Sequence, residues 1–131
     1  MPDLATNKRN VMEFYAMMFN DCRPREAIER YTGDDYIQHN PNIPQGRDAL
    51  RNIVETLPPS VHYEPGLVIA EGDLVAIHGR IRGWADEPQI LIDIFRIEGG
   101  KLVEHWDVLQ DEVAAAAGLP MFDPDENTHR H

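Results

Sequence analysis

Residues 93–107 read DIFRIEGGKLVEHWD, two apolar-rich runs on either side of the pair Gly99-Gly100. This pattern predicts two antiparallel β-strands joined by a tight turn. Three ionisable side chains, Asp93, His105 and Asp107, stand among the apolar residues of these strands. Because a buried charge is retained only where it is paired or used, these three residues are the leading candidates for a functional site.

The turn decides which side chains face each other across this hairpin. With a one-residue bulge beside the glycines, Asp93 lies opposite Asp107 and Phe95 lies opposite His105. With a plain two-residue turn the register moves by one residue, and Asp93 faces Trp106 instead. The sequence alone allows both registers. In either one, His105 and Asp107 share one face of their strand and Trp106 lies on the other.

The first half of the chain carries helical patterns. Apolar residues recur every three or four positions over residues 4–19, 24–31 and 49–57, which predicts three helices. Pro58-Pro59 ends the third of them. Residues 36–45 contain two prolines and several amide side chains, which predicts an extended loop.

From residue 61 onward the period changes from about 3.6 to 2, and glycine-bearing turns separate runs rich in Val, Ile and Leu. This predicts strands at residues 61–70, 74–84, 89–98 and 101–109. Pro65 places the first strand at a sheet edge or gives it a bulge. Helices followed by an antiparallel meander form an α+β order. We expect a curved antiparallel sheet wrapped around the N-terminal helices, a cone whose open mouth suits a small apolar ligand.

The length of 131 residues fits a single domain, which we place at residues 1–122. Residues 114–117, followed by Gly118, predict one last helical turn. The acidic segment 123–131 is expected to be a loose tail.

Composition limits the possible partners. The chain has 12 Lys+Arg and 23 Asp+Glu, a net charge of -11, which repels phosphate backbones and anionic lipids. We therefore expect neither a nucleic-acid nor a membrane partner. The single cysteine, Cys22, allows no internal disulfide and no cysteine-based metal centre. The N-terminus lacks a secretion pattern and no apolar run reaches membrane-spanning length, so we expect a cytoplasmic protein.

The two aspartates suggest acid–base chemistry. If Asp93 and Asp107 share a concave apolar face, their like charges and the loss of solvent raise the pKa of at least one carboxyl. Such a group acts as a general acid or base near neutral pH. His78, alone in an apolar strand, and His39, in the Pro-flanked loop, are expected to reach the same mouth. There they would donate protons, or hydrogen bonds to an enolate oxygen.

Each histidine also has a structural interpretation. His78 could be a core residue satisfied by a backbone carbonyl. His105 could lie on the outer face beside a partner subunit. His39 could belong only to a turn, since its neighbours Asn40, Pro41 and Asn42 are turn residues.

The aspartates have structural interpretations too. Asp107 could tie down the strand end or the turn at Gln110. Asp93 could form a buried ion pair with an arginine, the candidates being Arg80, Arg82 and Arg96. A metal site is a further alternative, because histidines and aspartates around one cavity could hold iron or zinc. A His-x-Asp pair on a strand is weakly specific for a metal, and we expect none.

Three stretches, residues 36–41, 76–80 and above all 93–107, resemble the SnoaL-like polyketide cyclases of the nuclear transport factor 2-like superfamily, which also contains ketosteroid isomerase and scytalone dehydratase. The resemblance implies a cone-shaped α+β barrel with a deep pocket and no cofactor, commonly paired through its sheet. It implies that Asp107 occupies the place of the acid/base of an intramolecular aldol closure. At the place of Asp93 the characterised cyclases have a histidine. The resemblance favours the bulged register, which puts both carboxyls in the pocket.

The combined expectation is a small cofactor-independent enzyme that performs acid–base chemistry next to a carbonyl, an aldol-type cyclisation or an isomerisation of a small apolar or polyketide-like substrate. Asp107 is the expected base, and Asp93 holds a proton or hydrogen-bonds the substrate. The residues expected to position the substrate or stabilise an enolate are His105, His78 and His39. Those expected to contact the substrate are Tyr36, Phe95, Phe14 and Tyr15.

Two other functions stay open. The same fold could serve as a non-catalytic ligand-binding or dimerisation module. It could also hydrolyse a strained ring such as an epoxide, provided that Arg80 or Arg96 points inward between the aspartates. In all cases the outward apolar residues Trp106 and Val108 predict a homodimer formed through the sheet.

Overall fold

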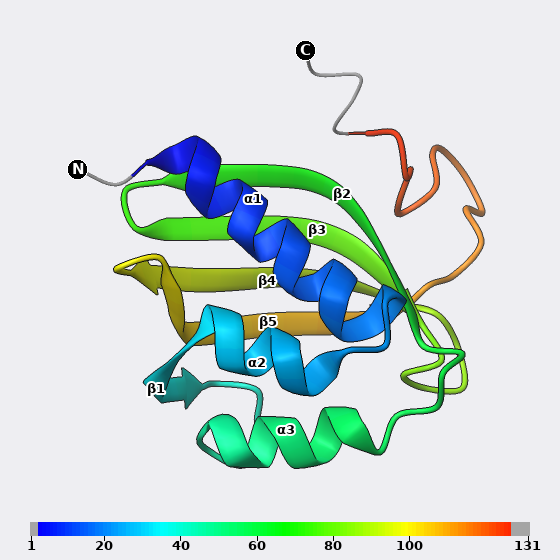
Figure 1. Ribbon diagram of the computed structural model, residues 1–131. Helices are drawn as coiled ribbons and strands as arrows, with labels where there is room; N and C mark the ends of the chain where they lie inside the picture. The colour runs from blue at the N-terminus through cyan, green and yellow to red at the C-terminus, as the bar shows by residue number, and fades with distance from the viewer. Residues whose placement is uncertain (1–2, 127–131) are drawn as a thin grey trace.

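The computed structural model describes residues 3–126 and consists of helices followed by strands (Figure 1). The helical elements are α1 (Leu4–Tyr15), the π-helical turn η1 (Ala16–Asn20), α2 (Pro24–Tyr31) and α3 (Arg47–Glu55). The strands are β1 (Thr32–Gln38), β2 (His62–Glu71), β3 (Leu74–Arg82), β4 (Gln89–Glu98) and β5 (Lys101–Asp111). The predicted change of period after residue 60 is confirmed.

The strands form one curved sheet in the order β1-β5-β4-β3-β2. Figure 1 shows the helices lying across one face of this sheet. The expected α+β class, with helices inside the curve of a sheet, is confirmed. The sheet is open and mixed, because β2 to β5 form an antiparallel meander whereas β1 runs parallel to β5.

Strand β1 was not expected, because residues 36–45 read as a loop from the sequence. The structure extends the chain from Thr32 to Gln38 along the free edge of β5 and begins the loop at His39. The pairing partner lies about 70 residues away, so no local pattern reveals it. Residues 114–117 form no helical turn, which corrects that prediction.

The end of the first helix fixes its position over the sheet. The predicted helix at residues 4–19 is α-helical to Tyr15 and continues as a π-turn to Asn20. The Asn20 side chain then donates to the backbone oxygen of Tyr63 (2.9 Å) and accepts from its N–H (2.8 Å). This two-way hydrogen bond holds the helix end to β2, because both backbone groups of a sheet residue are satisfied by one side chain.

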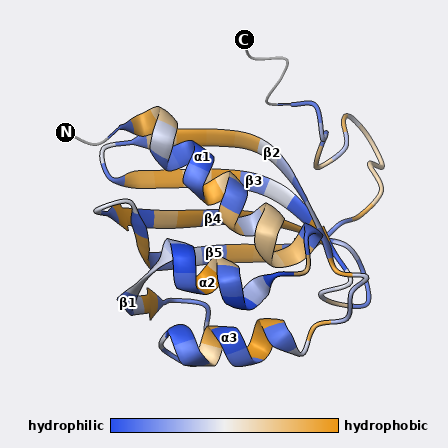
Figure 2. Ribbon diagram, in the orientation of Figure 1, coloured by the Kyte–Doolittle hydropathy of each residue, from blue (hydrophilic) through white to orange (hydrophobic). Residues whose placement is uncertain are grey.

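The core fills the space between the helices and the concave face of the sheet. Phe95 of β4 has no exposed surface and makes edge-to-face contacts with Phe14 and Tyr15 of α1, at centroid distances of 6.1 and 5.5 Å. Figure 2 shows hydrophobic residues recurring along the strands and on one side of the helices. Burying one such aromatic side chain contributes roughly 1.5–3 kcal/mol.

Strand β2 is an edge strand with a bulge between Pro65 and Val68, which confirms the interpretation of Pro65. The C-terminal segment packs beside this bulge. Phe122 is buried, and the Glu126 carboxylate accepts a hydrogen bond from the Leu67 N–H (3.0 Å). Residues 127–131 of the predicted tail lie outside the described residues, and the domain boundary at residue 122 stays a prediction. In the described range 3–126 no helix is long and apolar enough to cross a membrane, and the cytoplasmic location stays a prediction.

Candidate functional site

The hairpin adopts the bulged register. Asp93 pairs with Asp107 and Phe95 pairs with His105, and the register shifts by one residue between Arg96 and Ile97. The shift keeps both carboxyls on the same face of the sheet, since side chains directly opposite each other in adjacent strands point the same way. The sequence left two registers open, and the structure selects the one that brings the aspartates together.

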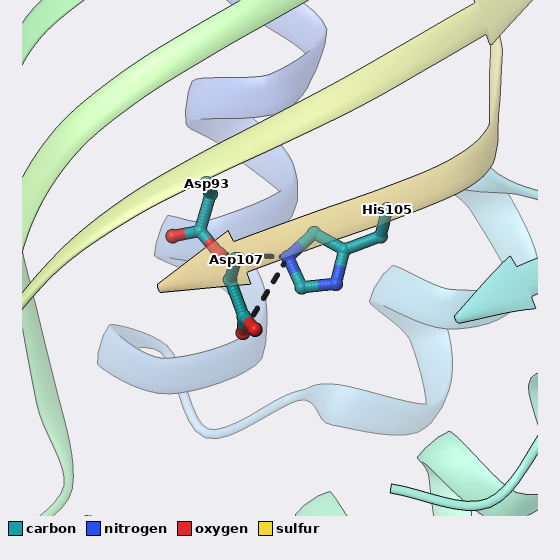
Figure 3. Close-up of side chains that lie close together, drawn as sticks. All are labelled: Asp93, His105 and Asp107. Atoms are coloured by element: carbon teal, nitrogen blue, oxygen red, sulfur yellow. Dashed lines mark hydrogen bonds and ion pairs between the residues drawn. The ribbon is translucent and has the colours of Figure 1, made fainter. Parts of the chain in front are cut away.

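His105 lies between the two carboxyls on the concave face (Figure 3). Its Nε2 is 2.7 Å from Asp93 Oδ1 and 3.8 Å from Asp107 Oδ2. Asp93 is fully buried and His105 is 4% exposed. The imidazole ring also stacks on Phe95 at 4.6 Å between centroids. The outer-face interpretation of His105 and the Asp93–arginine pair are therefore wrong.

The neighbours of Gln38 determine where the hydrogens of His105 lie. Gln38 Oε1 accepts from the backbone N–H of Asn40 (3.0 Å), so this atom is an acceptor. His105 Nδ1, 2.8 Å from the same oxygen, must therefore carry a hydrogen. The short contact between His105 Nε2 and Asp93 Oδ1 holds a second hydrogen, which belongs either to an imidazolium or to a carboxylic acid. The pair can thus exchange a proton without moving a heavy atom.

Asp107 is held by a different side chain. Asn40 Nδ2 donates to both carboxylate oxygens, at 3.0 and 3.1 Å. The backbone N–H of Asn42 donates to Asn40 Oδ1 (2.9 Å), which fixes the orientation of the amide. A two-point contact from a donor group suits an ionised carboxylate. The interpretation of Asp107 as a strand-end tie to Gln110 is therefore replaced by this contact with Asn40.

Asp93 is the carboxyl whose environment favours the protonated form. Burial raises its pKa; the hydrogen bond and charge of His105 and the Tyr15 hydroxyl oppose the rise, and the charge of Asp107 adds to it. Within the described residues Asp93 Oδ2 has no hydrogen-bond partner. One buried oxygen of the site is thus left to meet a bound molecule.

Three tyrosine hydroxyls surround this carboxyl. Burial, followed by the negative charge of Asp93, raises the pKa of Tyr15, Tyr36 and Tyr63. The three phenols therefore stay neutral at physiological pH and can donate hydrogen bonds. The Tyr63 hydroxyl is buried and, among the described residues, has no partner.

These groups line a cavity between the helices and the sheet. About 50 Å³ of it is open to the centres of water-sized molecules, and the whole hollow, counting the part open to solvent, measures about 500 Å³. The predicted residues Asp93, Asp107 and His105 all line it. The predicted substrate contacts that line it are Phe14, Tyr15, Tyr36 and Phe95. The hollow is narrow, but it is not filled.

The structure does not bring His39 or His78 to this cavity. His39 lies on the outer side, where it stacks on Trp106 at 4.9 Å and contacts Glu104 at 2.7 Å. His78 faces the outer surface and contacts Glu126 at 2.5 Å. The reason is strand alternation: Ile77 pairs with Asp93 on the concave face, so the next residue points away. The interpretations of His78 as a core residue and of both histidines as converging on the mouth are wrong.

The arginines also point away from the aspartates. Arg80 pairs with Glu64 (2.6 Å) and Glu112 (2.7 Å). Arg96 pairs with Glu104 (2.8 Å) and Glu98 (3.1 Å). Neither arginine completes the Asp-Arg-Asp arrangement that an epoxide-type hydrolase would need.

Sequence reasoning missed Gln38 and Asn40, the two residues that orient His105 and Asp107. It selected His39 between them because histidine is the more reactive side chain. In an extended segment alternate residues point to opposite sides, so an outward His39 places its two neighbours inward. The signal in the sequence was an amide residue on each side of a histidine in a segment rich in polar residues; in the structure both amides are buried.

The same three residues have the composition of a metal site. One ligand atom from each of Asp93, His105 and Asp107 lies within 4.8 Å of the others. A cation would have to displace the hydrogen between His105 and Asp93. It would also have to compete with the Asn40 amide for Asp107. The hydrogen-bond donors aimed at these carboxylates fit protonic chemistry better than a metal.

Known structures share this architecture. TsrD from Streptomyces laurentii is 22% identical, with a TM-score of 0.67 over 83% of this chain and 91% of that one. A protein from Kribbella flavida provisionally named a ketosteroid isomerase is 13% identical, with a TM-score of 0.72 over 88% and 86%. One from Bacillus cereus provisionally named a polyketide cyclase is 23% identical, with a TM-score of 0.65 over 76% and 71%. At these identities the likeness establishes the fold alone.

The fold and the site define a small α+β protein with a buried Asp-His-Asp cluster on the concave face of a curved sheet. The family model described as the SnoaL-like domain matches residues 11–105, well over half of the chain. The chain therefore belongs to the SnoaL-like family, as the resemblance predicted. No curated protein sequence matches it.

Proposed function

We propose that this protein is a cofactor-independent enzyme that removes a proton next to a carbonyl and returns it elsewhere, as in an aldol-type closure or an isomerisation. This general class of reaction agrees with the SnoaL-like family to which the chain belongs. Among the structural neighbours of the chain are proteins provisionally named polyketide cyclase and ketosteroid isomerase. The observation that carries the proposal is the pair of carboxyls 93 and 107, which share one histidine but have different hydrogen-bond partners.

The different environments assign different tasks to the two carboxyls. Asp107, ionised and held by Asn40, is the base that takes the α-proton of the substrate. Asp93 Oδ1 accepts from His105 Nε2–H, and Oδ2 carries the proton that burial favours, so Oδ2–H donates a hydrogen bond to the carbonyl oxygen as negative charge develops there. His105 keeps Asp93 oriented through Nε2 while Gln38 holds the other ring nitrogen. Two carboxyls in different environments can serve as acid and base in the same site.

The basic test is hydrogen exchange into a simple ketone. Cyclopentanone would be incubated with the wild-type protein in D₂O near neutral pD, and the loss of its α-proton signal would be followed by NMR. We expect exchange to exceed the buffer rate in proportion to protein concentration. Exchange at the buffer rate would contradict the proposed proton transfer and would leave the non-catalytic binding module as the alternative.

Asn40 provides a separate test of how Asp107 is held. We expect Asn40→Ala to lower kcat for exchange by about 10- to 100-fold, because hydrogen bonds to a charged group are worth roughly 1.5–3 kcal/mol. KM should stay nearly constant, since Asn40 would orient the base without holding the ketone. The matched control is Asn42→Ala, because Asn42 contacts Asn40 through its backbone and its side chain is exposed. An unchanged kcat in Asn40→Ala, or a rise in KM alone, would argue against this positioning role.

The outer face of the sheet supports the predicted homodimer, which we propose as the functional assembly. Ile69, Ile92 and Val108 are 62%, 43% and 72% exposed on three different strands of this sheet. Exposed apolar side chains that gather on one face commonly mark an interface. Sedimentation is expected to give about twice the 15.0 kDa mass of one chain. Val108→Asp should disrupt the interface and sediment with the mass of one chain. A wild-type protein that sediments as a monomer would contradict the dimer.

A further inference from the structure

We infer that the cavity selects compounds of no more than one ring, bound with an oxygen atom at Asp93 Oδ2. This inference rests on the proposed function in taking the cavity as the substrate site, and it narrows the expected substrates to small oxygenated compounds. Polycyclic polyketides are excluded.

The cavity offers little free space. A single buried water needs roughly 10–15 Å³ of such space. The whole cavity offers about 50 Å³ of it, which corresponds to a few heavy atoms. We therefore expect one ring to fill the space between the lining side chains, and a fused system of two or three rings not to fit.

Packed aromatic rings form part of the cavity wall. The Tyr15 ring lies 4.6 Å from that of Tyr63 and 5.3 Å from that of Phe19. Phe19 in turn contacts Trp84 edge-to-face at 6.5 Å. The backbone of Tyr63 is held on both sides by Asn20. Enlarging the cavity requires moving several mutually supporting rings, which a close-packed interior resists.

Two polar atoms of the lining residues are unused within the described part of the chain. Asp93 Oδ2 and the Tyr63 hydroxyl are both buried, line the cavity with their residues and, within residues 3–126, have no hydrogen-bond partner. Buried polar atoms without a partner are uncommon, and here the missing partner is a polar group of a ligand. A hydroxyl or a carbonyl oxygen can pair with Asp93 Oδ2, depending on which of the two carries the hydrogen.

A phenol series tests the size limit without turnover. Phenol, 1-naphthol and 9-phenanthrol would be titrated into the wild-type protein by calorimetry. We expect saturable one-to-one binding of phenol, and at least ~10-fold weaker binding of naphthol because overpacking costs roughly 1–3 kcal/mol. Phenanthrol should not bind. Equal or tighter binding of the larger compounds would overturn the inference.

Two substitutions in the wall make the test specific. Trp84 is only partly buried and lines the cavity, so Trp84→Ala should tighten naphthol binding by about 10-fold by removing the clash. Leu109→Ala provides a second enlarged cavity should the first variant fold poorly. Trp106→Ala is the matched control, because this tryptophan stacks on His39 outside the cavity. If Trp106→Ala also tightened naphthol binding, size selection by the wall residues would be contradicted. The same holds if neither Trp84→Ala nor Leu109→Ala tightened it.

The polar contact is tested with toluene, which has the size of phenol but no hydroxyl. We expect phenol to bind at least ~10-fold more tightly, in line with a buried hydrogen bond to a carboxyl. Equal affinities would overturn the assignment of Asp93 Oδ2 as the oxygen-binding atom. Because these titrations require no catalysis, a failed exchange assay with intact size selection would reject the proposed reaction alone. Catalysis combined with tight phenanthrol binding would reject the size limit alone.

Discussion

Asp107→Asn is expected to reduce the rate of α-proton exchange by about 10²- to 10⁴-fold, the range attributed to a general base. The amide has the shape of the carboxylate but cannot accept the substrate proton. Its oxygen can still accept from Asn40, so the variant should fold like the wild-type protein. NMR exchange rates and a thermal unfolding curve measured on the same sample would separate loss of chemistry from loss of structure.

The matched control for Asp107 lies on the same strand. Glu104 belongs to β5 but points to the outer face, where it contacts His39 and Arg96. Glu104→Gln should therefore leave the exchange rate unchanged. Activity of Asp107→Asn within twofold of the wild-type rate would remove Asp107 from the mechanism, and with it the division of labour between the carboxyls.

His105→Leu is expected to lower the free energy of unfolding by about 3–5 kcal/mol at pH 8, the range for breaking a buried charge pair by removing one partner. Without the imidazole, Asp93 Oδ1 loses its hydrogen bond while the carboxyl stays fully buried. Urea unfolding at pH 8 would measure the loss. His39→Leu, which removes an exposed histidine on the outer face, should change stability by less than about 1 kcal/mol.

The loss in His105→Leu should shrink as the pH falls. Burial already holds the pKa of Asp93 above its ordinary value of 3.8, and removing His105 deletes the contacts that oppose this rise. The folded chain then binds this proton more tightly than the unfolded chain does. Between the two pKa values the free energy of unfolding therefore decreases with rising pH. The difference between wild type and variant should be smaller at pH 5 than at pH 8, and a difference independent of pH would contradict the assignment.

A double variant separates the buried charge from simple packing. Asp93→Leu combined with His105→Leu removes both members of the pair, and apolar replacements of buried ion pairs are often neutral. We expect the double variant to regain most of the stability that His105→Leu loses. A double variant as unstable as the single one would show that packing of the imidazole against Phe95, rather than its contact with Asp93, holds this region together.

The sequence by itself determined the three N-terminal helices, the four strands of the antiparallel meander, the turn at Gly99-Gly100 and the placement of His105 and Asp107 on one face of β5. These features follow from local periodicity, because the side-chain direction along a single strand alternates with every residue. The family resemblance rested on the same hairpin. For that reason the general fold could be predicted, and Asp93, His105 and Asp107 could all be named as candidates, although the register that brings Asp93 to the other two stayed open.

Only the tertiary structure decided the rest: the bulged register that sets Asp93 opposite Asp107, the pairing of β1 with β5, and the amides that orient the site. Asn40 and Asp107 are 67 positions apart, and their contact forms only because β1 lies along the edge of β5. Strand pairing also decides that His39 and His78 point outward, because the face on which a residue lies depends on how its strand is paired in the sheet. The local sequence pattern sets the side-chain direction along a single strand. Pairing between distant strands decides which side chains come together at the cavity, and the packing of aromatic rings decides how much free volume is left there.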